Sequence, residues 1–185
     1  MNAYDLPTSL NIGGVEYQIR TDFRAIIDIL ISQSDPELDE YCKAIVLLQI
    51  LYVDWEQIPE AKMDEALKKA CDFIDCGQKD DGKPKPKMID WEQDAGIIIP
   101  AINKISHTEV RSVPYMHWWT FFAYFMEIGE SLFANVLSIR EKKAKRKKLE
   151  KWEQDFYRDN REMIDIRKKI SKEEQKQKDS LMKWL

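Results

Sequence analysis

The chain has 185 residues, of which 44% are hydrophobic and 34% charged, enough for one domain with an extension or for two small domains. Its net charge of −4 combines an acidic part, residues 1–139 at −11, with a basic part, residues 140–185 at +7. This asymmetry predicts electrostatic docking of the basic part on its own body, on a neighbouring copy or on an anionic partner.

The sequence argues against secretion and against a membrane protein. The first residues, MNAYDLPTSLNIGG, lack the basic start and apolar run of a signal peptide. Three cysteines, Cys42, Cys71 and Cys76, are an odd number and favour free thiols in a reducing compartment. The longest apolar run, Met116–Met126, is shorter than the roughly 20 residues that span a bilayer. We therefore expect a cytoplasmic protein with no membrane segment.

In chain order, the pattern predicts a β-hairpin followed by helices. Apolar residues alternate from Leu10 to Ile19 around Gly13-Gly14, which is typical of a two-residue hairpin turn. Thr21 is a plausible N-cap for an amphipathic helix that ends near Ser32. Two further helices are predicted, from about Glu37 to Val53 and from Pro59 to Ile74.

Residues 77–88 predict a flexible surface loop, because Gly, Pro and charged residues dominate them. Asp90 is a good N-cap for the next helix, which should reach Ile105. Pro100 lies inside this stretch and is expected to kink or interrupt it.

The densest aromatic cluster lies in Pro114–Leu137 and is expected to form the central core helix. Pro114 suits the first turn of a helix, and Met116–Met126 is apolar on every face, as in a buried helix. The alternative of a ligand pocket is disfavoured, because pockets combine apolar walls with a few convergent polar groups. The expected core scaffold is Trp118, Trp119, Phe121, Phe122 and Phe125.

From Ser131 onward neither Pro nor Gly occurs, so the pattern predicts a long basic C-terminal helix. From Leu149 to Ile170 a heptad-like seam then follows at alternating spacings of 3 and 4, apolar except for one polar break at Asp159, and it is able to dock a helical partner or its own body. The candidate partner-binding residues are Leu149, Trp152, Phe156, Met163, Ile166 and Ile170. The candidate electrostatic contacts are Arg140, Lys142, Lys143, Lys145, Arg146, Lys147 and Lys148.

The predicted fold is therefore mainly α: a helical core domain with an N-terminal hairpin, residues 1–139, and a basic helical extension, residues 140–185. The basic run Arg140–Lys151 has the charge for nucleic acid, but it lacks interleaved aromatic residues and the overall pI is about 5.4. A solvated helix face or a protein contact is the favoured interpretation. The apolar tip Leu181–Leu185 is too short to anchor the chain in a membrane.

No catalytic or metal-binding constellation stands out, so we expect neither an enzyme nor a cofactor. Cys71 and Cys76 are separated by four residues, a poor match to zinc half-sites, and the two histidines are interpreted as structural. Asp90, Glu92 and Asp94 follow one another at a spacing of two, and residues two apart on a helix do not share a face. Phosphate-binding loops and hydrolase or protease motifs are absent from the sequence.

Three segments resemble the gene-product-fifteen family of bacteriophage tail proteins from siphoviruses. They are IGGVEYQIRTDFR (Ile12–Arg24), His117–Phe121, and Ser138-Ile139-Arg140 with the Lys-rich run, Leu149, Tyr157 and Asn160 that follow. The resemblance covers about residues 4–165. None of these motifs is a catalytic fingerprint.

The resemblance implies a role in tail assembly in the bacterial host cytoplasm, as a chaperone for the tape measure protein, with the tail tube protein as a further possible partner. A tape measure protein is long and mostly helical, so its chaperone needs an apolar groove or amphipathic helix to cover exposed seams. A homo-oligomer is compatible with the opposite charges of body and arm. Two alternatives remain: a nucleic-acid-binding accessory protein that uses Arg140–Lys151, and a structural subunit of the tail.

Overall fold

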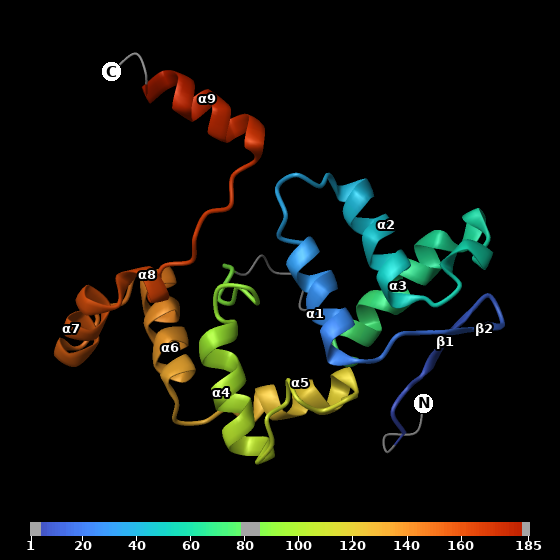
Figure 1. The fold of residues 1–185 in the computed structure, drawn as a ribbon, viewed down its shortest axis with the longest axis horizontal. Helices are drawn as coiled ribbons and strands as arrows, with labels where there is room; N and C mark the ends of the chain where they lie inside the picture. Colours follow the sequence, from blue (N-terminus) through green and yellow to red (C-terminus); the bar gives the residue numbers. More distant parts are fainter. Residues whose placement is uncertain (1–4, 79–85, 183–185) are drawn as a thin grey trace.

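The protein is mainly helical and starts with a two-stranded antiparallel hairpin, as predicted (Figure 1). The structure is a computed structural model that describes residues 5–78 and 86–182, so most of the expected loop 77–88 and the end of the apolar tip lie outside the described residues. The elements are β1 (Ser9–Ile12), β2 (Val15–Gln18), α1 (Phe23–Ser32), α2 (Glu40–Leu51), η1 (Trp55–Gln57), η2 (Glu60–Lys62), α3 (Met63–Ile74), α4 (Ala95–Ser106), α5 (Trp118–Met126), α6 (Leu132–Ala144), α7 (Lys151–Asp159), α8 (Arg161–Ile164) and α9 (Lys172–Met182).

The hairpin turns at Gly13-Gly14 and packs on the start of α3. Gly13 and Gly14 have φ of 59° and 89°, a backbone conformation that glycine adopts without steric cost. The register pairs Ile12 with Val15, and the Gly13 N–H donates to the Glu65 carboxylate at 3.0 Å. Because Ile12 is 2% exposed, the hairpin is anchored on the core rather than left as an isolated pair of strands.

The main core forms where α1 packs on α2 and α5, and where α2 packs on α3. Phe23 of α1 stacks on Phe121 of α5 with ring centroids 4.3 Å apart. Trp118 is 1% exposed, and its indole N–H donates to the carbonyl of Ile74 at 2.8 Å. This hydrogen bond joins the start of α5 to the end of α3, so residues distant in the sequence pack in the same core.

The aromatic helix α5 differs from the prediction in both its start and its burial. It begins at Trp118 rather than at Pro114, and the His117 ring accepts the Trp119 N–H as the N-cap. Only Trp118 and Phe121 of the expected scaffold are buried, whereas Trp119, Phe122 and Phe125 are half-buried. The expectation of a helix buried on every face is therefore wrong, because α5 lies along the edge of the body with one side open to solvent (Figure 1).

Two local predictions on helix boundaries are also corrected. Asp22, not Thr21, caps α1 and accepts the Arg24 N–H at 3.0 Å, while the Thr21 hydroxyl bonds Tyr115. Pro100 lies inside α4 without dividing it. Its missing N–H would have bonded the carbonyl of Gly96, and both residues are exposed, so water can take the place of the lost bond.

The long basic C-terminal helix is replaced by separate helices, α6 to α9. Helix α6 ends at Ala144, and Arg146 adopts a left-handed φ of 53° while the Lys147 N–H donates back to Lys142 at 2.8 Å. A new helix, α7, then starts at a capping box in which Glu150 and Glu153 bond each other's backbone N–H. These paired terminal signals stop and restart the helix where the sequence shows neither Pro nor Gly.

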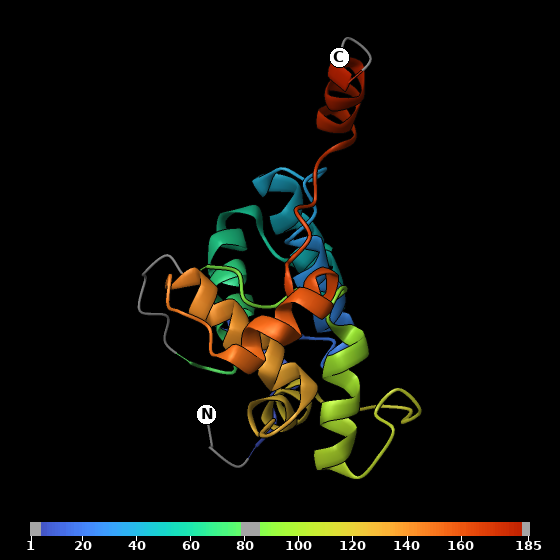
Figure 2. The same cartoon turned by 90° about the vertical axis from the view of Figure 1, so that its left-hand side faces the viewer.

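Helices α6, α7 and α8 form a small second core beside the main one. Val136, Ile139 and Ile164 are fully buried there, and Ile97 of α4 contacts both cores. The predicted domain boundary between residues 139 and 140 falls inside α6. Helix α9 extends away from the rest of the chain (Figures 1 and 2).

Candidate interaction surface

A buried arginine holds the second core to α4. The Arg140 guanidinium donates to both carboxylate oxygens of Asp94, at 2.6 and 2.8 Å, and both side chains are at most 5% exposed. It also donates to the carbonyls of Met88, Met163 and Ile164 at 2.6 to 2.9 Å. With all five N–H groups used, Arg140 joins α4, α6 and the end of α8.

Four of the seven candidate electrostatic contacts thus pair within the chain. Besides Arg140, Lys142 bonds the buried Glu153 at 2.7 Å. Lys143 pairs with Asp165 and lies over the Tyr157 ring, 3.7 Å from its centroid. Lys145 pairs with Glu141 one turn earlier on α6. Only Arg140 thereby contacts the acidic part of the chain, since the partners of the three lysines lie within residues 140–185 themselves.

The remaining three cations form a patch that we call the basic turn: Arg146, Lys147 and Lys148, in the connection between α6 and α7. All three are exposed, and none of them forms an ion pair with any residue that the structure describes. They are the part of the predicted electrostatic surface that stays available to a partner.

The predicted apolar seam is divided between the second core and the surface. Leu149, Phe156 and Met163 pack against the buried residues of that core. Trp152 is 49% exposed on α7. Ile166 and Ile170 are half-buried in the segment between α8 and α9, which is not helical. The chain bends at this seam, so the six residues do not line one helix face.

Sequence reasoning missed Gln93, which clamps the segment after α8. Its side-chain amide donates to the carbonyl of Asp165 at 3.0 Å, and its oxygen accepts the Arg167 N–H at 3.0 Å. Lys169 adds an ion pair to Glu92 at 2.7 Å. No sequence signal identifies such a contact, since an isolated Gln before a helix is usually solvated.

Acid is expected to loosen α7 and α8 before the main core. Burial favours the neutral form of Glu153, but hydrogen bonds from Lys142 and the Glu150 backbone outweigh it and hold its pKa below 4.5. Burial also favours the neutral form of Asp165, but hydrogen bonds from Lys143 and Tyr157 outweigh this effect and hold its pKa below 3.8. Because both pKa values are depressed on folding, these pairs stabilise the fold at neutral pH, and that stabilisation is lost as the pH falls below about 4.5.

Hydrogen exchange measured between about pH 6 and pH 3, after correction for the intrinsic rate, checks this prediction. The amides of α7 should lose protection before those of α1. The control is Glu153→Gln, which removes one of the titrating groups and should flatten the dependence. Equal loss of protection in α7 and α1 would contradict the prediction.

A shallow apolar groove lies between α4 and the start of α6. It encloses about 260 Å³, and Leu132, 43% exposed, forms one of its walls. Gly96 opens it from α4, since a Cβ built there would meet nothing within 4 Å. The full lining is Gly96, Ile97, Pro100, Ala101, Lys104, Glu130, Ser131 and Leu132.

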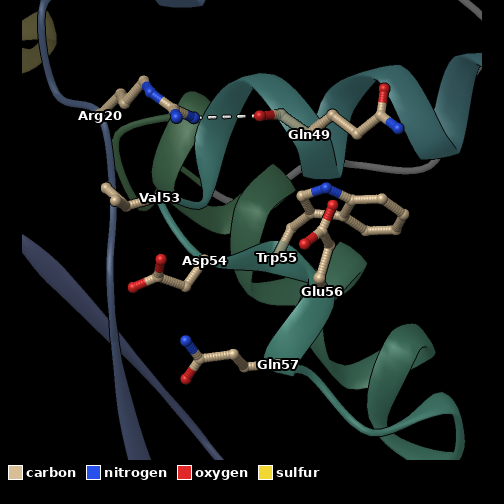
Figure 3. A pocket seen from close by; sticks show the side chains of 7 residues that line it. All are labelled: Arg20, Gln49, Val53, Asp54, Trp55, Glu56 and Gln57. Carbon is tan, nitrogen blue, oxygen red and sulfur yellow. Dashed lines mark hydrogen bonds between the residues drawn. The ribbon is translucent and has the colours of Figure 1, made fainter.

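A second hollow, of about 270 Å³, lies beside η1 (Figure 3). Arg20 borders it, but one nitrogen of its guanidinium donates to the carbonyls of Gln49, Ile50 and Tyr52 at the end of α2. Arg20 therefore caps that helix. The carboxylates of Asp54 and Glu56 line the same hollow and form no ion pair with any described residue.

The described residues include no group of three or more His, Cys, Asp or Glu side chains placed to hold a metal ion. Nor does any helix among them have the length and hydropathy needed to cross a membrane.

The fold defines a class: a mainly helical protein with an N-terminal hairpin, a second small core tied on by a buried ion pair, and charged and apolar surface patches. The family model described as Bacteriophage Gp15 protein matches residues 3–166, and the chain belongs to this family. Helix α9 lies outside the matched residues. Neither the curated proteins nor the solved structures include a match.

Proposed function

We propose that this phage protein is a non-catalytic chaperone of tail assembly that binds the tape measure protein in the cytoplasm of the host cell. Membership of the Gp15 family supports a phage role, and the family resemblance implies tail assembly. The observation that carries the binding mechanism is the groove between α4 and α6, whose walls at Ile97, Pro100 and Leu132 are apolar.

This groove suits one helix of a client better than the predicted seam does. Three seam residues, Leu149, Phe156 and Met163, already contact the second core. The groove instead leaves Leu132 exposed, with Lys104 and Glu130 at its border. An amphipathic helix can insert apolar side chains spaced three and four apart into such a groove, and border charges then favour one orientation. The tape measure protein, which the family resemblance implies as the client, is expected to supply such a helix.

Co-expression of the full chain with tape measure segments tests the proposal, with complexes measured by size-exclusion chromatography and light scattering. Wild-type chain should keep an otherwise insoluble segment in a defined complex. Gly96→Arg should abolish that complex, because the new side chain enters the groove. The fold should survive the change, since Gly96 has ordinary helical geometry, no atom lies within 4 Å of the added Cβ, and Arg is a better helix former.

Two further variants separate the surfaces. Trp152→Arg removes the exposed member of the predicted seam, and Met126→Arg changes an exposed apolar residue (58% exposed) that does not line the groove. If only Trp152→Arg abolished binding, the client-binding site would lie on α7 and not in the groove. A client that stays insoluble with wild-type chain would contradict the chaperone role itself.

A further inference from the structure

The backbone of the basic turn is held in a fixed shape, although its side chains form no ion pair with any described residue. The Arg146 N–H donates to Lys143 at 3.0 Å and the Lys147 N–H to Lys142 at 2.8 Å, which closes the end of α6. On the other side, Lys142 bonds Glu153 of α7. Three cations are thus displayed on an ordered backbone, so binding there costs little loop entropy.

The opposite charge gathers around η1, η2 and the start of α3. Four carboxylates there are exposed and form no ion pair with any described residue. Two bases near this set have partners elsewhere: Arg20, which also borders the hollow, donates to carbonyls at the end of α2, and Lys62 pairs with Glu65 at 3.0 Å. We call this set the acidic end; it comprises Asp54, Glu56, Glu60 and Asp64.

The hollow of Figure 3 gives the acidic end a receptor shape. Asp54 and Glu56 supply carboxylates, and Val53 and Trp55 supply apolar surface. A lysine or arginine side chain suits this combination, because its hydrocarbon stem covers apolar atoms while its charged head meets the carboxylates. The hollow has a volume of about 270 Å³, which leaves room for such a side chain.

The two patches lie at opposite ends of the longest axis and do not meet within one chain. In Figure 1, α7 and the end of α6 occupy one extreme, whereas the hairpin and the start of α3 occupy the other. The contact between the Gly13 N–H and Glu65 confirms that the hairpin turn and the start of α3 are neighbours. A charge match between two different ends of one molecule generates head-to-tail contacts, which build rings or open filaments.

We propose that the basic turn of one copy docks on the acidic end of a second copy, with Arg146 or Lys147 entering the hollow between Asp54 and Glu56. The second copy is favoured over nucleic acid, because the receptor for the cations is present on the chain itself. This contact does not depend on a tape measure protein, so it is tested with the purified chain alone, and its failure leaves the proposed function standing.

Sedimentation velocity of the full chain, at several concentrations, provides the readout. At about 50 mM salt the chain should form species larger than a monomer that grow with concentration, and at about 500 mM salt these should dissociate, because exposed charges are then screened. A monomer under all of these conditions would overturn the proposal. So would a low-salt assembly that disappears on nuclease treatment, since the basic turn would then be binding nucleic acid.

Charge reversal identifies the two surfaces. One variant carries Arg146→Glu, Lys147→Glu and Lys148→Glu, and the other carries Asp54→Lys, Glu56→Lys and Glu60→Lys. Each alone should weaken self-association about tenfold or more, since three attractive pairs become repulsive. Mixing the two variants should restore association, because each then offers a complementary end to the other. Restoration also shows that both variants are folded.

The matched control is Lys172→Glu, Lys176→Glu and Lys178→Glu on α9, which changes the net charge by the same amount as the basic-turn variant. These three side chains are exposed and belong to neither patch. Association should stay near wild type in this control. An equal effect of the control and the basic-turn variant, or a mixture that fails to reassociate, would overturn the proposal.

Discussion

Replacement of Arg140 by alanine is expected to lower the free energy of unfolding by about 3–5 kcal/mol, the usual cost of breaking a buried ion pair by removing one partner. The Asp94 carboxylate, which is 1% exposed, would lose the two hydrogen bonds that the Arg140 guanidinium donates to its oxygens. The carbonyls of Met88, Met163 and Ile164 would lose theirs as well. Urea denaturation followed by circular dichroism measures the change.

Three companion variants sharpen this prediction. Lys145→Ala removes an exposed pair with Glu141 on the same helix and should cost less than about 1 kcal/mol. Arg140→Lys should still be strongly destabilising, since an ammonium cannot bond both oxygens of Asp94 and three carbonyls at once. Arg140→Met with Asp94→Leu should be less damaging than Arg140→Ala, because no unpaired charge remains buried. Equal effects of Arg140→Ala and Lys145→Ala would contradict a structural role for the pair.

Local signals in the sequence predicted the hairpin and most helices. Gly13-Gly14 between alternating apolar residues gave the turn at the observed position, because two adjacent residues with positive φ favour glycine. The apolar spacing of 3 and 4 located the helices up to Ile74 within a few residues. These features depend on neighbours in the sequence, so a sequence pattern contains the information needed.

The pair of Arg140 and Asp94 could not be predicted in the same way. The two residues are 46 positions apart, and Arg140 starts a lysine-rich run whose sequence resembles a solvated helix face. Its burial follows from the packing of α6 between α4 and α8, a tertiary arrangement that periodicity does not encode. The same holds for Gln93, whose partners lie some 70 residues further along the chain.

The helix break after Ala144 was missed for a different reason. A helix usually ends at Gly or Pro, and here Arg146 takes the left-handed position that glycine usually occupies. The capping box at Glu150 and Glu153 was present in the sequence but was masked by the surrounding helix-forming residues. Three apolar residues of the predicted seam, Leu149, Phe156 and Met163, pack on the second core, but the bend places the other three elsewhere.

Replacement of Trp118 by alanine is expected to destabilise the protein by about 3–5 kcal/mol, as for other large aromatic side chains in cores. The indole contacts Phe121 and Phe122, with ring centroids 5.9 and 5.4 Å away. Its loss would leave a cavity between α3 and α5 and an unpaired carbonyl at Ile74, because the N–H that bonds it at 2.8 Å would be gone.

The matched control is Trp152→Ala, which removes the same side chain from a half-exposed position on α7. Trp152 is 49% exposed, and its indole N–H bonds only the exposed Glu150, so the change should cost less than about 1 kcal/mol. Thermal and urea unfolding of the two variants under one set of conditions gives the comparison. Since the residue removed is identical, the difference isolates what burial at the junction of α3 and α5 contributes. If the two variants were equally stable, α5 could not be the helix that closes the main core.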